Sequence, residues 1–248
     1  MLNDVSSGMV ELVLFIANVN QLSHQVSWLF SKHPETDFSR NRKISFQSLI
    51  HFYLCLESGS IRHELLKYFA YDPNTVSNSA FHQQRSKFLP ETFPFLFRQF
   101  NSHYSFSLYK GKYHLLACDG SFFTFTRNPR DTDSYFPPDG KTTNGYNQVH
   151  TDALFDLLSK RYCDTVVQPI RKKNEFQALA ELIDRYHIPD TIPVFIADRG
   201  FHSFNVFAHA IEHGFYFLIR VEDVNMRRLL GDGLADEECF DIQVHRIA

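Results

Sequence analysis

Apolar residues recur at two different spacings along this chain, and the change between them near residue 110 divides it into two parts. In the first part they recur at helical intervals, in residues 10–17, 46–56 and 61–69. From Tyr113 onward, short apolar runs separated by turn residues predict strands. The pattern therefore predicts a helical N-terminal domain over residues 1–108, followed by an α/β domain over residues 109–238.

The second part has a definite order of elements. Short connections join its first strands, which predicts an antiparallel β-meander, whereas helical crossovers between the later ones predict parallel pairing. The predicted order is strands 113–118, 122–126, 146–158 and 162–170, helix 174–186, strand 193–197, helix 203–213 and strand 215–221, with a long loop over 127–143. The order β-meander, helix, strand, helix, strand is that of the ribonuclease H-like fold, in which the first and fourth strands are neighbours.

Two aspartates stand where buried strands are predicted to end. Asp119 follows the apolar run 113–118, and Asp198 follows 194–197. Carboxylates at the carboxyl ends of neighbouring strands gather at one rim of a sheet, where open α/β folds bind ligands. Aspartate is also common after strands because it favours turns and helix N-caps. The fold order favours the first interpretation, since it brings together two residues 79 positions apart and makes a site for divalent metal.

Polar and basic residues in the helical part are candidates for contact with nucleic acid. A helix predicted over 78–88, capped by Ser77 or Asn78, carries side chains able to touch phosphates and base edges. A second basic cluster lies at residues 40–43. The candidates are Arg40, Arg42, Lys43, Gln84, Arg85 and Lys87. The same residues are equally consistent with a solvated helix face and an ordinary basic loop.

Composition adds three constraints. Net charge is −3, but residues 1–112 carry 11 Lys/Arg against 8 Asp/Glu and the remainder carries 14 against 20. A basic part beside an acidic part is compatible with an enzyme that handles DNA. The four cysteines form no C-x-x-C pair, which favours reduced thiols in a cytoplasmic protein. No run approaches the roughly 20 apolar residues of a membrane span, and no signal peptide is evident.

Several motifs of the second part resemble those of bacterial insertion-sequence transposases of the DDE type, in the IS-four group. The matching pieces are Ala117-Cys-Asp-Gly-Ser121, Gly145-Tyr-Asn-Gln-Val149, Ile196-Ala-Asp-Arg-Gly-Phe-His-Ser-Phe204 and Gly214-x-x-Phe-Leu-Ile-Arg220. The last two pieces, in fixed order, are the most specific. The resemblance extends over about residues 40–221.

This resemblance implies a function and a set of partners. Asp119 and Asp198 are expected to be the first two acids of a catalytic site holding two Mg²⁺ or Mn²⁺ ions. The implied partners are double-stranded DNA, at insertion-sequence ends and at the target, and a second copy of the chain in a homodimer. Arg199 is expected to orient the site or a phosphate, or to form a structural ion pair. Arg220 is expected to contact DNA or to cap the sheet.

One family feature is missing from the sequence. The third acid of the family is a glutamate in a Tyr-x-x-Arg-x-x-x-Glu-x-x-x-x-x-x-Lys signature, which this sequence lacks. The expectation is a C-terminally truncated transposase in which residues 239–248 open a β-rich insertion. Such a chain alone is expected to cleave little or no DNA. The alternatives are a non-catalytic DNA-binding regulator, a gene remnant, or another metal-dependent nuclease or phosphatase using Glu212 or Glu222.

Overall fold

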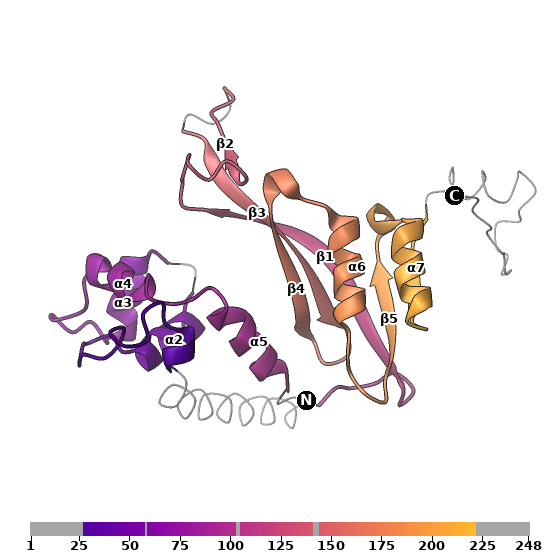
Figure 1. Ribbon diagram of the computed structural model, residues 1–248, viewed down its shortest axis with the longest axis horizontal. Coiled ribbons are helices and arrows are strands. Elements are labelled where there is room, and N and C mark those ends of the chain that lie inside the picture. The colour runs from indigo at the N-terminus through magenta and orange to yellow at the C-terminus, as the bar shows by residue number, and fades with distance from the viewer. Residues whose placement is uncertain (1–26, 58, 103–104, 141–143, 222–248) are drawn as a thin grey trace, which may run out of the picture. The chain divides into compact units, whose positions relative to one another are not determined.

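A computed structural model describes residues 27–57, 59–102, 105–140 and 144–221 (Figure 1). The chain divides into two compact units between Ser105 and Phe106, here called the N-terminal unit and the sheet unit. The helix expected over 10–17 and the strand expected from residue 239 lie outside the described residues, as does Glu222. Among the described residues, every helix is too short or too polar to pass through a bilayer.

The described residues of the N-terminal unit form short helices joined by turns, with an isolated β-bridge between Ser31 and Phe88. Its helices are η1 (Ser27–Phe30), α2 (Phe46–Leu54), α3 (Ile61–Tyr68), α4 (Asn78–Arg85) and α5 (Thr92–Ser102). Serine hydroxyls satisfy the first free backbone N–H groups of three helices: Ser45 for α2, Ser60 for α3 and Ser77 for α4. Leu49, Leu65 and Phe81, one from each of these helices, are fully buried in a common apolar core.

The sheet unit contains one six-stranded mixed sheet. Its strands are β1 (Tyr113–Phe125), β2 (Tyr135–Phe136), β3 (Tyr146–Asp156), β4 (Arg161–Pro169), β5 (Ile192–Ala197) and β6 (Tyr216–Ile219). β1, β3 and β4 form an antiparallel meander, and β2 pairs antiparallel with the first residues of β3. β5 pairs with β1 and β6 pairs with β5, both in parallel. This mixed sheet is consistent with the ribonuclease H-like core that the sequence predicts.

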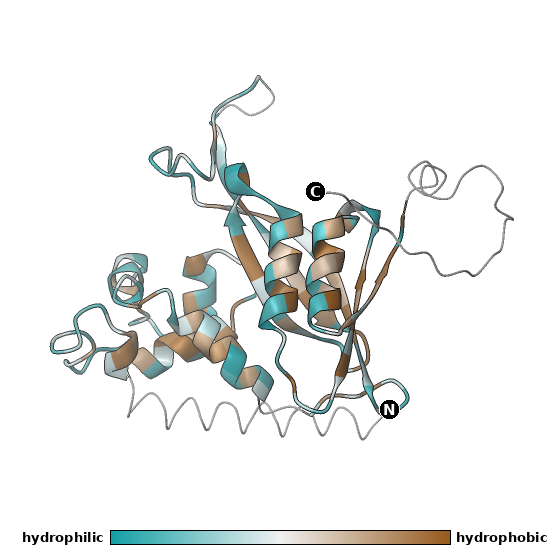
Figure 2. Cartoon of the chain, turned by 45° about the vertical axis from the view of Figure 1, so that its right-hand side comes forward, coloured by the Kyte–Doolittle hydropathy of each residue, from teal (hydrophilic) through white to brown (hydrophobic). Residues whose placement is uncertain are grey.

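Two crossover helices cover one face of this sheet. α6 (Glu175–Arg185) leads from β4 to β5, and α7 (Phe204–Glu212) leads from β5 to β6 (Figure 1). Leu179 and Leu182 of α6 are fully buried against β-strand side chains, which contributes about 1.5–3 kcal/mol for each. In Figure 2 hydrophobic residues line the strands, whereas both helices carry hydrophilic residues as well. The helices therefore hold β5 and β6 in place beside β1.

The structure corrects the predicted elements in two places. The strands predicted over 113–118 and 122–126 are one strand, β1, because β3 pairs with it continuously from Leu116 to Phe125. Asp119 and Gly120 therefore lie inside a strand, and the prediction that a strand ends at Asp119 was wrong. The loop predicted over 127–143 contains the short strand β2, which adds to the edge of β3.

Candidate functional site

The two aspartates singled out by sequence follow paired positions of neighbouring strands. Cys118 of β1 and Ala197 of β5 are the last partners of the parallel pairing. Asp119, inside β1, and Asp198, directly after the end of β5, are the next residues, so they occupy the same level of the sheet. Side chains alternate between faces along a strand. Because Cys118 and Ala197 pack into the core beneath α6 and α7, the two aspartates belong on the opposite face of the sheet, away from these helices, and both are exposed.

Each carboxylate is oriented by a nearby glycine. The backbone N–H of Gly120 donates to Asp119 Oδ1 at 2.8 Å, and the backbone N–H of Gly200 donates to Asp198 Oδ1 at 2.8 Å. Asp198 is also the N-cap of the 3-10 helix η3 (Arg199–Phe201). A Cβ on Gly200 would lie 3.0 Å from Asp198 Oδ1, so glycine leaves room for this carboxylate. Two exposed, oriented carboxylates are suitable oxygen donors for Mg²⁺ or Mn²⁺.

Two arginines lie near the same end of the sheet. Ala197 pairs with Ile219 of β6, so Arg220 follows β6 at the level where Asp198 follows β5. Arg199 is the first residue of η3, and both arginines are exposed. The sheet thus presents two carboxylates and two guanidinium groups near the level where β5 and β6 end. Glu212 is at the end of α7, which carries the chain back to the start of β6, so it lies at the opposite edge.

A second cluster of ionisable groups lies behind β1, on the face covered by α6. His150 and Asp152 of β3 are fully buried, and the His150 Nδ1 to Asp152 Oδ2 distance is 3.1 Å. His150 Nε2 is 3.2 Å from Oε1 of Glu175, the first residue of α6. Burial raises the pKa of Asp152, and the nearby carboxylate of Glu175 contributes to the rise. Sequence reasoning missed this cluster.

The Cys118 thiol connects the two faces electrostatically. Burial raises its pKa far above the usual range, and Asp152, Asp119, Glu175 and Asp198 add to the rise, in that order. Acids on both sides of β1 therefore contribute to the negative potential at one buried sulfur. This thiol has no tendency to ionise and acts as a small core side chain.

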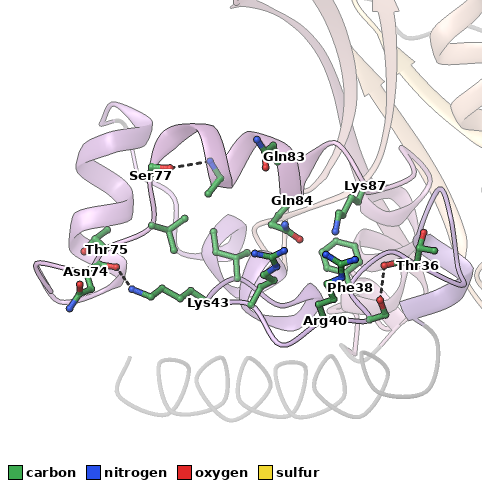
Figure 3. A pocket seen from close by; sticks show the side chains of 15 residues that line it. Thr36, Phe38, Arg40, Lys43, Asn74, Thr75, Ser77, Gln83, Gln84 and Lys87 are labelled. Atoms are coloured by element: carbon green, nitrogen blue, oxygen red, sulfur yellow. Dashed lines mark hydrogen bonds between the residues drawn. The ribbon is translucent and has the colours of Figure 1, made fainter.

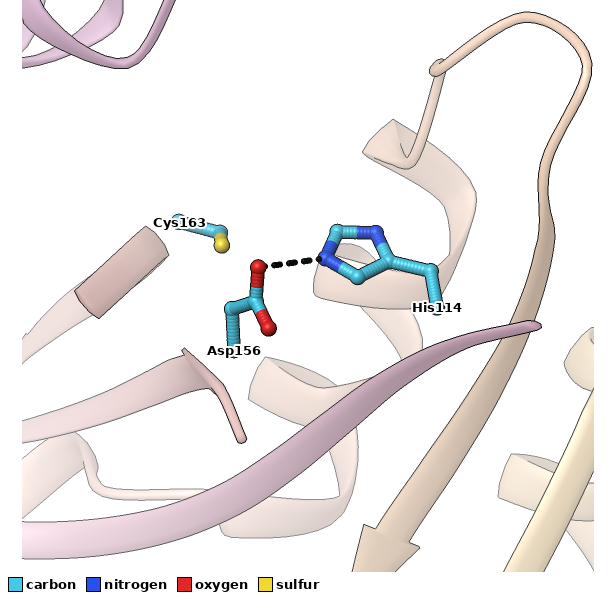
Figure 4. Close-up of side chains that lie close together, drawn as sticks. All are labelled: His114, Asp156 and Cys163. Atoms are coloured by element: carbon cyan, nitrogen blue, oxygen red, sulfur yellow. Dashed lines mark ion pairs between the residues drawn. The ribbon is translucent and has the colours of Figure 1, made fainter. Parts of the chain in front are cut away.

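A third cluster lies near the start of β1 (Figure 4). His114 Nε2 is 3.2 Å from Asp156 Oδ2, both residues are fully buried, and the Cys163 sulfur belongs to the same group within 4.8 Å. Burial lowers the pKa of His114, partly offset by Asp156. Burial raises the pKa of Asp156, but hydrogen bonds from Ser159 and the charge of His114 lower it more, so the net pKa is below the usual range.

A signal for both clusters was present in the sequence. His150, Asp152 and Asp156 share the two-residue phase of Leu154, which is buried in the core. Polar residues at positions in phase with a buried leucine indicate a buried polar network, because an unpaired polar group in that place is costly. The cysteine spacing alone gave no indication that Cys163 joins a histidine and an aspartate.

In the N-terminal unit, most of the predicted DNA contacts line one groove, a cavity of about 610 Å³ (Figure 3). The described residues that line it include no Asp or Glu. The predicted residues among them are Arg40, Arg42, Lys43, Gln84 and Lys87. Arg85 is not among the lining residues. Lys43 donates to the Asn74 carbonyl at 2.6 Å, and the Lys87 ammonium lies 3.8 Å from Asp37.

Comparisons with known proteins bear on this arrangement. No curated protein matches the chain. Among solved structures, the Drosophila P element transposase strand transfer complex aligns with a TM-score of 0.35 and 10% identity, over 85% of this chain and 49% of that one. The chain thus spans about half of that chain. Residues 110–244, more than half of the 248 residues, match the family described as the transposase DDE domain. The chain belongs to the transposase DDE domain family.

Proposed function

We propose that this chain is a DNA transposase of the IS-four group, in which Asp119 and Asp198 are two of the metal-binding acids. The observation that carries the proposal is the parallel pairing that ends at Cys118 and Ala197, because it sets both carboxylates at one level of adjacent strands. Family membership accounts for the dependence on a divalent ion. The assignment of these two residues as its ligands is our inference.

The donor set suits a pair of Mg²⁺ or Mn²⁺ ions. When bound, such ions would activate the attacking oxygen and stabilise the leaving oxygen of a displacement at phosphorus. The chain's own groups orient the carboxylates and supply positive charge. The N–H groups of Gly120 and Gly200 fix one oxygen of each carboxylate. Arg199 and Arg220 supply positive charge at the same edge for a DNA phosphate.

We further propose that the groove of the N-terminal unit binds duplex DNA. Its lining combines Arg40, Arg42, Lys43 and Lys87 with the amides of Gln83 and Gln84. Cationic side chains attract phosphates, although Lys87 is shared with Asp37, and amide side chains can hydrogen-bond to base edges. The DNA would be an insertion-sequence end, held in a homodimer that pairs two ends.

The third acid of the site is not assigned. The printed sequence contains no glutamate in the Tyr-Arg-Glu-Lys spacing of the IS-four group, and Glu212 lies at the wrong edge of the sheet. A two-metal site that lacks one ligand holds its ions weakly. We therefore expect the 248-residue chain by itself to bind DNA and to cleave little or none of it.

Calorimetric titration with Mn²⁺ tests the metal assignment. Asp119→Asn and Asp198→Asn should each weaken one binding event by roughly tenfold or more. Asp190→Asn is the matched control, because Asp190 is also exposed but lies before the start of β5. Equal affinity in all four proteins would exclude the assignment. Robust Mg²⁺-dependent nicking of a transposon-end duplex, abolished by Asp119→Asn, would show instead that the third acid is present.

A non-catalytic regulator is the second candidate function. One observation favours it: the groove is built entirely from residues of the N-terminal unit and uses neither aspartate. Such a regulator would bind transposon ends equally well as wild type and as the Asp119→Asn, Asp198→Asn double variant, with no Mn²⁺ binding at the aspartates.

A further inference from the structure

The cluster behind β1 contains two buried ligand atoms that lack hydrogen-bond partners among the described residues. They are Nε2 of His150 and Oδ1 of Asp152. Both point toward the backbone of Gly120, because a Cβ placed on that glycine would lie 2.7 Å from Nε2 and 3.2 Å from Oδ1. Glycine at position 120 therefore leaves these two atoms converging on one space.

Proton placement satisfies only part of the cluster. A ring protonated on both nitrogens would donate to Asp152 Oδ2 and Glu175 Oε1, but Asp152 Oδ1 would still lack a donor. If the Nδ1–H of His150 donates to Asp152 Oδ2, a neutral ring presents a lone pair at Nε2. That lone pair faces Oε1 of Glu175 at 3.2 Å, so two acceptors meet. Asp152 Oδ1 then remains a buried acceptor without a donor. Buried acceptors that meet without a donor are costly, and a cation between them removes the cost.

We propose that His150, Asp152 and Glu175 bind a transition-metal dication, such as Zn²⁺ or Mn²⁺, at a site separate from the aspartate pair. One ligand atom from each residue lies within 4.8 Å of the others, which is the spread of donors around a single ion. One imidazole nitrogen and two carboxylate oxygens match the ligand preferences of Zn²⁺ and Mn²⁺, whereas Mg²⁺ favours oxygen alone.

The surroundings leave a route for the ion. His150 and Asp152 are fully buried, but the side chain of Glu175 is 34% exposed, so water can occupy a fourth position on that side. Lys173 is the competing cation, since its ammonium lies 3.1 Å from the same Oε1 of Glu175. Metal binding displaces this ammonium, and removal of Lys173 should strengthen metal binding.

The bound ion would link β3 to the first turn of α6. It lies on the core side of β1, whereas Asp119 and Asp198 lie on the opposite face, away from α6 and α7, so the two sites use different ligands. Because the ligands converge only in the folded chain, the ion should raise the thermal stability of the protein. The inference does not depend on the proposed transposase function.

Titration of the full chain with Co²⁺, followed by visible absorption, tests this site. Low-coordinate Co²⁺ bound to imidazole and carboxylate absorbs visibly, and Zn²⁺ should displace it. The Asp119→Asn, Asp198→Asn double variant should keep the signal. Glu175→Gln should weaken binding by roughly tenfold or more, and Lys173→Ala should tighten it, because the competing ammonium is removed.

Two further variants make the result decisive. His150→Gln should abolish the signal, and circular dichroism should verify that this variant folds. If His150→Gln does not fold, Glu175→Gln still tests the site, because Glu175 is partly exposed. Cys163→Ala should leave the signal unchanged, because its cluster is a different one. A signal that survives Glu175→Gln unchanged, that disappears with Cys163→Ala, or that is absent from the wild type would overturn the proposal.

Discussion

Cys118 and Ala197 are partners in the parallel pairing of β1 with β5, and each is followed directly by an aspartate. Adjacent strands lie about 4.8 Å apart. The two aspartates are therefore brought within the range of a shared metal site by backbone pairing, although they are 79 positions apart in the chain. The proposed site depends on this relationship more than on any side-chain contact.

A disulfide tests this proximity. Cysteines can be joined when their Cα atoms are about 4.4–6.8 Å apart, so the double variant Asp119→Cys, Asp198→Cys should form a disulfide under mild oxidation. Peptide mass spectrometry identifies the linked pair. The native Cys118 should stay reduced, because burial and the surrounding acids raise its pKa and keep it a thiol.

The matched control places the second cysteine at the other end of β5. Ile192 pairs with Tyr113, and Asp190 precedes Ile192, so a cysteine at 190 is separated from position 119 by at least six residues of strand, or about 20 Å. The double variant Asp119→Cys, Asp190→Cys should not link. Equal linkage in both variants, or none in the first, would contradict the pairing.

Part of the site was predictable because it follows from strand order. Apolar runs ending in Asp119 and Asp198, with a helix capped by Asn174 between them, predict adjacent parallel strands, and β1 and β5 are adjacent. The element order determines the pairing, and a local sequence pattern reveals that order. No contact between distant side chains had to be anticipated.

The buried clusters were not predicted because they depend on distant side chains. His150 meets Glu175 only when α6 packs on the sheet, and Gly120 becomes part of a strand only because β3 pairs with β1 from Leu116 to Phe125. A glycine after an aspartate is typical of a turn. Tertiary pairing overrides this local preference, so the prediction that a strand ends at Asp119 was wrong.

Gly120→Ala should destabilise the sheet unit. The added Cβ would lie 2.6 Å from Cε1 of the fully buried His150, and overpacking of this kind costs about 1–3 kcal/mol. Urea unfolding followed by circular dichroism measures the change.

Gly200→Ala is the control variant, since its Cβ would meet only the exposed carboxylate of Asp198 at 3.0 Å. It should change stability by less than about 0.5 kcal/mol. Similar effects of the two changes would contradict the close packing of His150 on Gly120.

Stability should fall as the pH drops below the usual histidine pKa of 6.5. Burial lowers the pKa of His114 in the folded chain, so the unfolded chain binds this proton first as pH falls through 6.5. The free energy of unfolding therefore decreases from that point until the lower folded pKa is passed. Asp156 acts in the same direction at lower pH, because its folded pKa lies below the usual 3.8.

Urea unfolding between pH 5 and 7.5 checks this dependence, with His114→Gln as the test variant. The variant should be less stable overall, but its free energy of unfolding should vary less with pH than that of the wild type. His187→Gln is the control, because His187 is exposed and its replacement should leave the slope unchanged. An unaltered slope in His114→Gln would assign the acid sensitivity to other groups.

Replacement of groove arginines should reduce both DNA affinity and its dependence on salt. Arg40 and Arg42 line the groove, whereas Arg85 does not. Each lost phosphate contact should flatten the plot of log K against log salt by about 0.9. Fluorescence anisotropy with a labelled duplex at several salt concentrations gives this slope for Arg40→Ala, Arg42→Ala and Arg85→Ala. The first two should flatten it and the third should not. If Arg85→Ala matches the other two, the DNA follows the outer face of α4 and not the groove.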